Sequence, residues 1–226
     1  FDFRKAFDQV NHNLLLHKLK LFGIPDPFIL WFSDFLSQRS FSVKVNYHIG
    51  EPSLLIPSGV PQGSVSGPLL FLIFINDLLL DLACVPELNV SAFADDIKLY
   101  SHDPSILQVG IDMVVAWAES NFLPLAQSKT TLLRLGPCNP HFPFHIASTQ
   151  IPDSTFARDL GFITEPNLKF TSHINRTVGL ALLRTKQLLK SFQSNSPKFY
   201  IYLFQCYVLP IIEYCSVIYF PAPPPP

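Results

Sequence analysis

Two groups of aspartates have the residue types and spacing for metal-ion chemistry. Asp2 and Asp8 flank residues 3–7, and the adjacent pair Asp95 and Asp96 follows a short apolar stretch. Carboxylates beside buried strands are unfavourable unless they are paired or bound to a cation, and adjacent like charges repel each other. If Asp2 and Asp95 lie on neighbouring strands, they could hold two divalent ions about 3.5–4 Å apart, an arrangement that serves phosphoryl transfer. Oxygen ligands favour Mg²⁺ over zinc. The alternative is a solvated turn at 95–96 and a frayed end at Asp2.

A glycine-rich loop over residues 57–67 has the composition of a nucleotide-contacting segment. Glycines let the backbone approach a ligand closely, and the N-terminus of the following helix favours an anion. Gln62 adds an amide side chain to this loop. The alternative for such a loop, taken alone, is a plain connector.

Hydrophobic periodicity predicts the elements that would position these residues. Leu15, Leu19 and Phe22 recur at helical spacing ahead of Gly23, and every second residue from 41 to 49 is apolar, as in a strand. The other predicted elements are a strand at 1–3, helices at 26–36 and 68–80, a hairpin at 89–100 with both aspartates in its turn, a helix from 104, a strand at 130–135, and helices at 171–193 and 197–209. This order favours an α+β layer followed by a helical appendage at about 165–220.

Composition and charge exclude several classes of protein. The 226 residues are 48% apolar and 15% charged, which excludes a disordered tail, and the net charge of −1 excludes a globally basic nucleic-acid-binding protein. Charge is nevertheless unevenly placed. Residues 158–198 hold seven basic side chains against two acidic ones, a net charge of +5, so the rest of the chain sums to −6. One basic segment beside an acidic body suits a protein that holds a polyanion at one place and metal ions at another.

Other sequence features concern compartment and chain ends. The four cysteines form no CxxC pair, which favours a reducing compartment, and neither a signal peptide nor a membrane span is expected. Proline is abundant, with 21 residues, and the last six residues, 221–226, read as a polyproline II tail. Because the chain opens inside a predicted strand and without Met, we expect its N-terminus to be cut rather than native.

Five segments together resemble one known family. In chain order they are FDFRKAFD (1–8), SGVPQGSVSGPLLFLIFINDL (58–78), SAFADDIKLY (91–100), SKTTLL (128–133) and DLGFITEPNLKFTSHI (159–174). Their order and spacing resemble polymerase motifs A to E of the reverse transcriptases of LINE-type non-LTR retrotransposons. The resemblance implies an α+β right-hand polymerase palm, an antiparallel sheet backed by helices, over residues 1–164. It implies a partial helical thumb over 165–220, ahead of the polyproline tail.

The resemblance also implies a two-metal centre. Asp2 resembles the metal ligand of motif A, with the backbone carbonyl of Phe3 beside it. Asp95 resembles the metal ligand of motif C, and Asp96 its less directly bound partner. The implied cofactor is a pair of Mg²⁺ ions, which Mn²⁺ could replace, and the implied activity is RNA-directed DNA synthesis.

Further side chains match positions that contact substrate in this family. Phe7 resembles the aromatic steric gate under the sugar, which disfavours a ribose 2′-hydroxyl. Gln62 and Gly63 match the motif B loop against the template base and incoming nucleotide. Lys129 matches the motif D lysine that protonates departing pyrophosphate, and its alternative is a solvated lysine at a strand edge.

The last motif and the basic segment resemble contacts to the primer. Leu160 and Gly161 match the motif E turn that grips the primer, and residues 158–198 fit a thumb lying along phosphates. The implied partners are an RNA template, a DNA primer and deoxynucleoside triphosphates, with no membrane and no assigned oligomeric state. The implied location is inside the cell, in nucleus and cytoplasm, as a ribonucleoprotein.

The chain also departs from the family pattern. Ser66 stands where the family usually has a bulky apolar residue, Ala126 stands where an asparagine is common, and we expect the fingers, which precede motif A in relatives, to be absent. We therefore expect little or no activity from the isolated chain. The alternative is a decayed retroelement fragment that binds nucleic acid at most. A palm of the group II intron maturase kind would need a maturase domain after the thumb, which the polyproline end does not offer.

Overall fold

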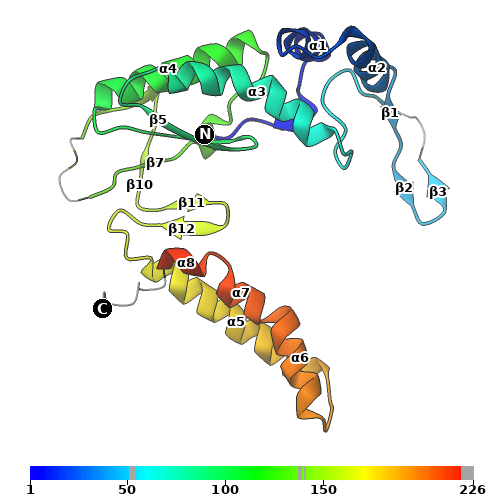
Figure 1. The fold of residues 1–226 in the computed structure, drawn as a ribbon. Coiled ribbons are helices and arrows are strands. Elements are labelled where there is room, and N and C mark those ends of the chain that lie inside the picture. The colour runs from blue at the N-terminus through cyan, green and yellow to red at the C-terminus, as the bar shows by residue number, and fades with distance from the viewer. Residues whose placement is uncertain (51–53, 137–138, 140, 220–226) are drawn as a thin grey trace. The chain divides into compact units, whose positions relative to one another are not determined.

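The computed structural model describes the whole chain except residues 51–53, 137–138, 140 and 220–226 (Figure 1). The predicted polyproline tail therefore lies outside the described residues. The chain divides into two compact units. The first comprises Phe1–Thr130 and Phe142–Ile151, and the second comprises Thr131–His141 and Pro152–Pro226. The palm and thumb boundary expected at 164/165 stays a prediction.

Four α-helices form most of the first unit. They are α1 (His12–Leu21), α2 (Asp26–Leu36), α3 (Gly67–Ala83) and α4 (Pro104–Ser120). Each boundary has a local cause: the Asn11 side chain accepts the Leu14 amide at the start of α1, and the Asp103 side chain accepts the Ser105 amide at the start of α4. Gly23, at φ +86°, follows the end of α1. The helices therefore begin and end close to where the sequence predicts.

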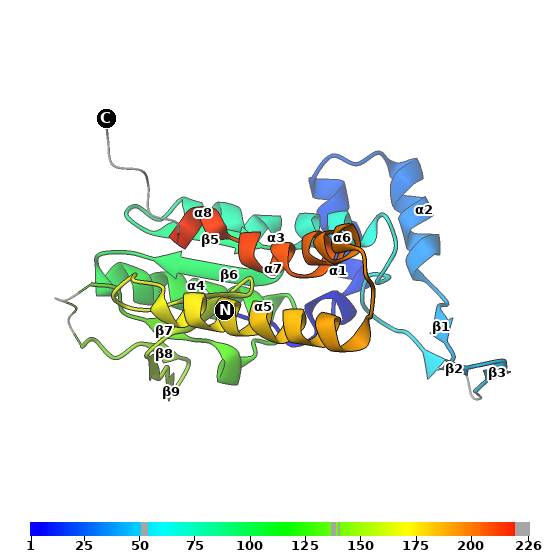
Figure 2. The ribbon, with the colours of Figure 1, turned by 90° about the horizontal axis from the view of Figure 1, so that it is seen from below.

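A β-hairpin lies against α3 and α4 (Figures 1 and 2). Its strands are β5 (Asn89–Phe93) and β6 (Asp96–Tyr100), paired antiparallel from Asn89 opposite Tyr100 to Phe93 opposite Asp96. A two-residue turn of Ala94 and Asp95 joins them, and Ala94 has a φ of 53°. The prediction that both aspartates lie in this turn is wrong for Asp96, because Asp96 pairs with Phe93 as the first residue of β6. The core beneath the hairpin consists of fully buried apolar side chains, the largest of which include Phe3, Phe71 and Phe74.

The strand predicted at 41–49 is wrong. In its place, β1 (Ser40–Phe41) pairs with β4 (Leu54–Leu55), and β2 (Lys44–Val45) turns back through Asn46 to pair with β3 (His48–Ile49). Asn46 has a φ of 55°, a left-handed conformation that asparagine tolerates. Both faces of these strands are exposed, so no buried face specifies one continuous register.

The end of the first unit holds η2 (Gln127–Lys129), a 3₁₀-helix, and the small hairpin of β8 (His145–Ile146) and β9 (Thr149–Gln150). The hairpin packs against α4, where the Gln108 side chain exchanges hydrogen bonds with the backbone of His145. The predicted strand at 130–135 shrinks to β7 (Leu132–Leu133), which pairs in parallel with β10 (Asp153–Ser154) in the second unit.

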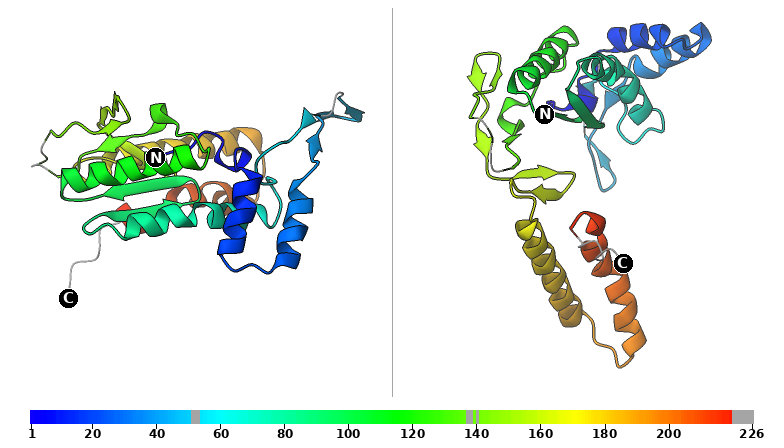
Figure 3. Two further views of the ribbon diagram at one scale, coloured as in Figure 1. Left: turned by 90° about the horizontal axis from the view of Figure 1, so that it is seen from above. Right: turned by 60° about the vertical axis from the view of Figure 1, so that its left-hand side comes forward.

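The second unit is mainly helical. The hairpin of β11 (Ala157–Asp159) and β12 (Phe162–Thr164) precedes α5 (Thr171–Ser191), α6 (Pro197–Tyr207), α7 (Leu209–Glu213) and α8 (Ser216–Tyr219). In Figure 3, α5 lies alongside α6 and α7. None of the described helices combines the length and apolar character that crossing a bilayer requires. The predicted α+β class, small sheets with helices, is confirmed.

Candidate active site

Residues 1–3 run alongside the hairpin and bring Asp2 to its tip. Phe1 and Ile97 exchange both of their backbone hydrogen bonds, at 2.6 and 3.3 Å. In antiparallel geometry the next pair along is Asp2 opposite Asp96, on one face of the sheet. On its other edge, the carbonyl of Asp2 accepts the amide of Ala126 at 2.8 Å. Two carboxylates separated by more than ninety residues in the chain are thus neighbours in space.

Lys129 of η2 reaches this cluster of carboxylates. Its Nζ lies 2.8 Å from Oδ2 of Asp2. The hydrogen bond with Asp2 raises the pKa of Lys129, and the charges of Asp2, Asp95 and Asp96 act in the same direction. The structure therefore places Asp95 and Asp96 within electrostatic range of the ammonium that Asp2 binds.

Phe7 belongs to η1 (Ala6–Asp8), a short 3₁₀-helix that directly follows this segment. Its ring stacks on Phe71 of α3 with centroids 4.5 Å apart and planes 24° apart. Phe7 is half-buried, so one side of the ring is held by the core while part of it stays accessible.

The glycine-rich loop packs directly against η1. The amide of Val60 donates to the carbonyl of Phe7 at 2.8 Å, and Nε2 of Gln62 donates to Oδ1 of Asp8 at 2.9 Å. Gly59 has a φ of +89°, and a Cβ there would lie 2.6 Å from the carbonyl oxygen of Asp8. Only glycine allows this approach of the two backbones. Phe7 and Gln62 therefore line the same region of the first unit.

Comparison with known proteins identifies the family. Residues 1–175 match the family model described as reverse transcriptase (RNA-dependent DNA polymerase). The chain is a member of the reverse transcriptase family.

Relatives of this reverse transcriptase domain come from mobile elements. It is 30% identical over 202 residues to a probable RNA-directed DNA polymerase from transposon BS of Drosophila melanogaster, covering 83% of this chain and 22% of that protein. It is 34% identical over 131 residues to the RNA-directed DNA polymerase from mobile element jockey of the same species, covering 53% of this chain and 14% of that protein. The matched part thus spans between about a seventh and a fifth of the length of these curated relatives. The resemblance to reverse transcriptases of LINE-type elements is confirmed.

The donor set of the reverse transcriptase domain suits a hard cation. Asp2, Asp95 and Asp96 offer only oxygen ligands, and a positive charge, the Lys129 ammonium, already binds one of them. Among the described residues, no group of three or more His, Cys, Asp or Glu side chains is close enough to hold a metal ion. The carboxylates would therefore have to move closer together to share a cation.

The turn predicted to grip the primer lies in the second unit. Leu160 and Gly161 join β11 to β12 with φ values of 45° and 86°, as a two-residue hairpin turn requires. The hydroxyl of Tyr214 donates to the carbonyl of Leu160 at 2.5 Å. The primer contact itself stays a prediction.

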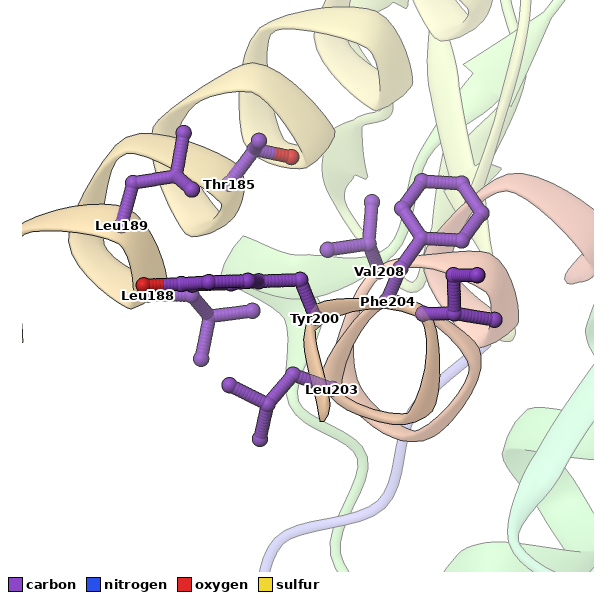
Figure 4. Close-up of a pocket in the computed structure, with 8 residues that line it drawn as sticks. Thr185, Leu188, Leu189, Tyr200, Leu203, Phe204 and Val208 are labelled. Atoms are coloured by element: carbon purple, nitrogen blue, oxygen red, sulfur yellow. The ribbon is translucent and has the colours of Figure 1, made fainter. Parts of the chain in front are cut away.

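The second unit contains apolar cavities, which differ in chemistry from the carboxylates of the first unit. One cavity of about 310 Å³ lies between α5 and α6 (Figure 4), and its wall includes Leu188, Leu189, Tyr200 and Phe204. No carboxylate lines it, so it offers nothing to a metal ion.

Sequence reasoning missed the contact between Asp8 and Gln62. It singled out both residues, one as half of an acidic pair and the other as the amide of the glycine-rich loop. One signal could have revealed the contact. The Asp8 carboxylate can only accept and the Gln62 amide can donate, and the two motifs that carry them must lie close together if they serve one site.

Proposed function

We propose that this chain is the palm and part of the thumb of a polymerase that copies RNA into DNA during retrotransposition. The observation that carries the proposal is the meeting of Asp2 and Lys129 beside Asp95 and Asp96. The antiparallel hairpin of β5 and β6 backed by α3 and α4 supports the palm assignment, and membership of the reverse transcriptase family supports the reaction.

The carboxylates are proposed to hold the metal centre. Two Mg²⁺ ions, or Mn²⁺ in their place, when bound by Asp2, the backbone carbonyl of Phe3, Asp95 and Asp96, would lower the pKa of a primer 3′-hydroxyl and neutralise the triphosphate. The Lys129 ammonium lies 2.8 Å from Oδ2 of Asp2 and would donate a proton to the departing pyrophosphate.

The other side chains are proposed to select and hold the substrates. Phe7, held by its stack on Phe71, would lie under the sugar of the incoming nucleotide and exclude a 2′-hydroxyl. Gln62 and Gly63 would contact the template base and that nucleotide. Base pairing with the RNA template supplies the sequence information, so the protein itself needs only shape and backbone contacts.

The second unit is proposed to hold the primer strand. Leu160 and Gly161 would contact the primer, and the basic segment 158–198 would follow the phosphates of the duplex. We propose a nuclear and cytoplasmic location, as a ribonucleoprotein with the template, on the family resemblance alone.

The test is incorporation of deoxynucleotides by a chimera. This chain replaces the matching segment of the transposon BS polymerase, because it spans about a fifth of that protein. Asp95→Asn is expected to lower Mg²⁺-dependent incorporation on an RNA template by about a hundredfold or more. Mutation even of residues that only hydrogen-bond to a metal ligand lowers metal affinity or activity by about 10–100-fold. The matched control is Asp34→Asn, an exposed aspartate of α2, which should leave the rate unchanged.

Two results would contradict the proposal. Undiminished incorporation by Asp95→Asn would remove that residue from the catalytic centre. A chimera that binds template and primer but incorporates nothing, beside an active parent polymerase, would favour a decayed retroelement fragment.

A further inference from the structure

Asp8 lies at the junction between the glycine-rich loop and η1. Its Oδ1 accepts a hydrogen bond from Nε2 of Gln62 at 2.9 Å, and its backbone carbonyl accepts one from Oγ of Ser58, also at 2.9 Å. We propose that Asp8 is a positioning residue that fixes the orientation of the Gln62 amide and thereby sets nucleotide selectivity. The inference rests on the proposed function, because Gln62 is assigned there to the nucleotide.

The two backbones that carry these side chains are locked together. The amide of Val60 donates to Phe7, and the amide of Gly59 donates to Val10, both at 2.8 Å. The Nε2 of His12 forms a further hydrogen bond to the carbonyl of Gly59 at 2.8 Å. These contacts lie on both sides of Asp8 along the chain, so the loop cannot slide along η1 without breaking several of them at once.

The close approach at Gly59 adds a steric constraint. A Cβ at this position would lie 2.6–2.7 Å from three backbone atoms of Asp8, closer than real Cβ atoms come to backbone. The loop therefore rests directly on the backbone of Asp8. This backbone contact, and not only the two side chains, fixes the distance between the Asp8 carboxylate and the Gln62 amide.

The carboxylate determines which way the amide faces. An ionised carboxylate only accepts hydrogen bonds, whereas the amide of glutamine has one donating and one accepting end. Gln62 must therefore turn its NH₂ group toward Asp8 and its Oε1 away. Because Gln62 is exposed, Oε1 and the second N–H are presented to whatever binds there. Without the charge, a half-turn of the amide would present the opposite pattern of donor and acceptor.

The same short segment also carries the proposed steric gate. Phe7 precedes Asp8 directly and is fixed by its stack on Phe71. A nucleotide that contacts both Phe7 and Gln62 would thus meet two groups held by adjacent residues of η1. This arrangement couples discrimination at the sugar to discrimination at the base pair.

The first experiment tests the hydrogen bond in the chain itself. In the ¹⁵N-labelled chain, Gln62→Ala identifies the NMR signals of the Gln62 NH₂ group, and their exchange with water is measured with and without Asp8→Ala. We expect exchange to accelerate about tenfold when the carboxylate is removed, as for loss of about 1.4 kcal/mol of hydrogen bonding. Asp26→Asn, an exposed aspartate at the start of α2, should leave the exchange rate unchanged. Equal exchange in the chain and in Asp8→Ala, with the remaining spectrum intact, would overturn the proposal.

The second experiment is a double-mutant cycle in the chimera with the transposon BS polymerase. Asp8→Ala is expected to raise KM for the correct deoxynucleotide about tenfold with kcat changed less than about twofold, and to lower the preference for the correct over a mismatched nucleotide. If Asp8 acts through Gln62, adding Asp8→Ala to Gln62→Ala should change neither quantity further. Additive effects, or a fall in kcat with unchanged KM, would overturn the proposal.

The two experiments separate this inference from the proposed function. Accelerated amide exchange in the Asp8→Ala chain, together with a chimera that never incorporates nucleotide, would contradict the polymerase assignment, and the claim about selectivity would fall with it. Normal incorporation with unaltered selectivity in Asp8→Ala would contradict only the role of Asp8.

Discussion

At the scale of single residues, the contact between Lys129 and Asp2 links two groups with different proposed roles. The ammonium lies 2.8 Å from a carboxylate oxygen that is proposed to bind metal, and the Lys129 side chain is 65% exposed. The Asp2 side chain is 26% exposed, so this ion pair is partly exposed and weakened by solvent, and we expect a divalent cation to displace it. The lysine would then be released close to the place where pyrophosphate leaves. A single residue could in this way respond to metal binding before it acts as an acid.

Lys129→Met should strengthen metal binding while it slows catalysis. Removal of the competing ammonium is expected to tighten Mn²⁺ binding about two- to fivefold, as measured by electron paramagnetic resonance on the chain. In the chimera the same change should lower incorporation, because the proposed proton donor is lost. Lys20→Met, which removes an exposed lysine of α1, is the control. Weaker Mn²⁺ binding in Lys129→Met would contradict the competition.

We expect His173 to make the stability of the second unit sensitive to acid. It is buried against Phe162, and it accepts the amide of Ile163 at Nδ1. Burial lowers the pKa of His173, and the charge of Arg176 lowers it further. Below the ordinary pKa of about 6.5, the unfolded chain binds a proton that the folded chain does not, so stability falls as the pH decreases through that value. The loss ends once the pH is below the pKa of the folded state.

His173→Leu should reduce this acid sensitivity. Urea unfolding followed by far-UV circular dichroism at pH 7.5 and 5.5 would measure it, with the exposed His102→Gln as the control. We expect the stability difference between the two pH values to shrink in His173→Leu and to persist in His102→Gln. An unchanged difference in both variants would assign the acid sensitivity to other groups.

At the scale of secondary-structure elements, Asp77 of α3 connects three helices. Its Oδ2 lies 2.7 Å from Nζ of Lys18 in α1, and its Oδ1 accepts the indole N–H of Trp117 in α4 at 3.0 Å. The Lys18 ammonium also donates to the carbonyl of Phe74 and lies over the rings of Phe74 and Trp117. The indole in turn packs edge-on against Phe3, with centroids 6.1 Å apart. The helix layer is therefore fixed to the residue next to Asp2.

Asp77→Ala should destabilise the first unit. The Lys18 side chain is only 12% exposed and would lose its charge partner, which costs about 3–5 kcal/mol in a fully buried pair. Because the Asp77 side chain is 48% exposed, we expect about 1–3 kcal/mol in urea unfolding. Asp81→Ala, one turn further along α3 and exposed, should change stability by less than about 0.5 kcal/mol. Equal effects in the two variants would show that the network contributes little.

At the scale of the whole molecule, charge is divided between the two units. The aspartates of the proposed metal centre belong to the first unit, whereas all seven basic residues of the segment 158–198 belong to the second. On α5, Lys186 and Lys190 are four residues apart and exposed, so they lie on one side of the helix. The net charge of −1 is therefore the sum of an acidic first unit and a basic second unit.

Lys186→Gln combined with Lys190→Gln should weaken the salt dependence of duplex binding. Each phosphate contact contributes about 0.9 to the slope of log K against log salt, so loss of two should reduce the slope by about 1.8. Fluorescence anisotropy with a labelled DNA duplex over a series of salt concentrations measures this slope. Lys20→Gln combined with Lys44→Gln removes the same charge from the first unit and should leave the slope unaltered. Equal slopes in both double variants would show that α5 does not contact the phosphates.

Much of the fold could be predicted, since its helices are specified locally. The limits of α1, α2 and α3 follow from caps, proline and apolar spacing within a few residues of each end. The strand predicted at 41–49 failed for the opposite reason. Its alternation is genuine, but without a buried face the preference of Asn46 for a turn prevailed.

The family, the candidate carboxylates and the glycine-rich loop could be predicted from the chain alone, because the types and order of these residues do not depend on the fold. Three contacts became evident only from the fold: Asp2 lies beside Asp96, Lys129 binds Asp2, and Gln62 turns its NH₂ group to Asp8. These contacts join residues 54 to 127 positions apart. A hydrogen bond or ion pair depends on separations of about 3 Å, and periodicity along the chain cannot specify such distances between remote segments.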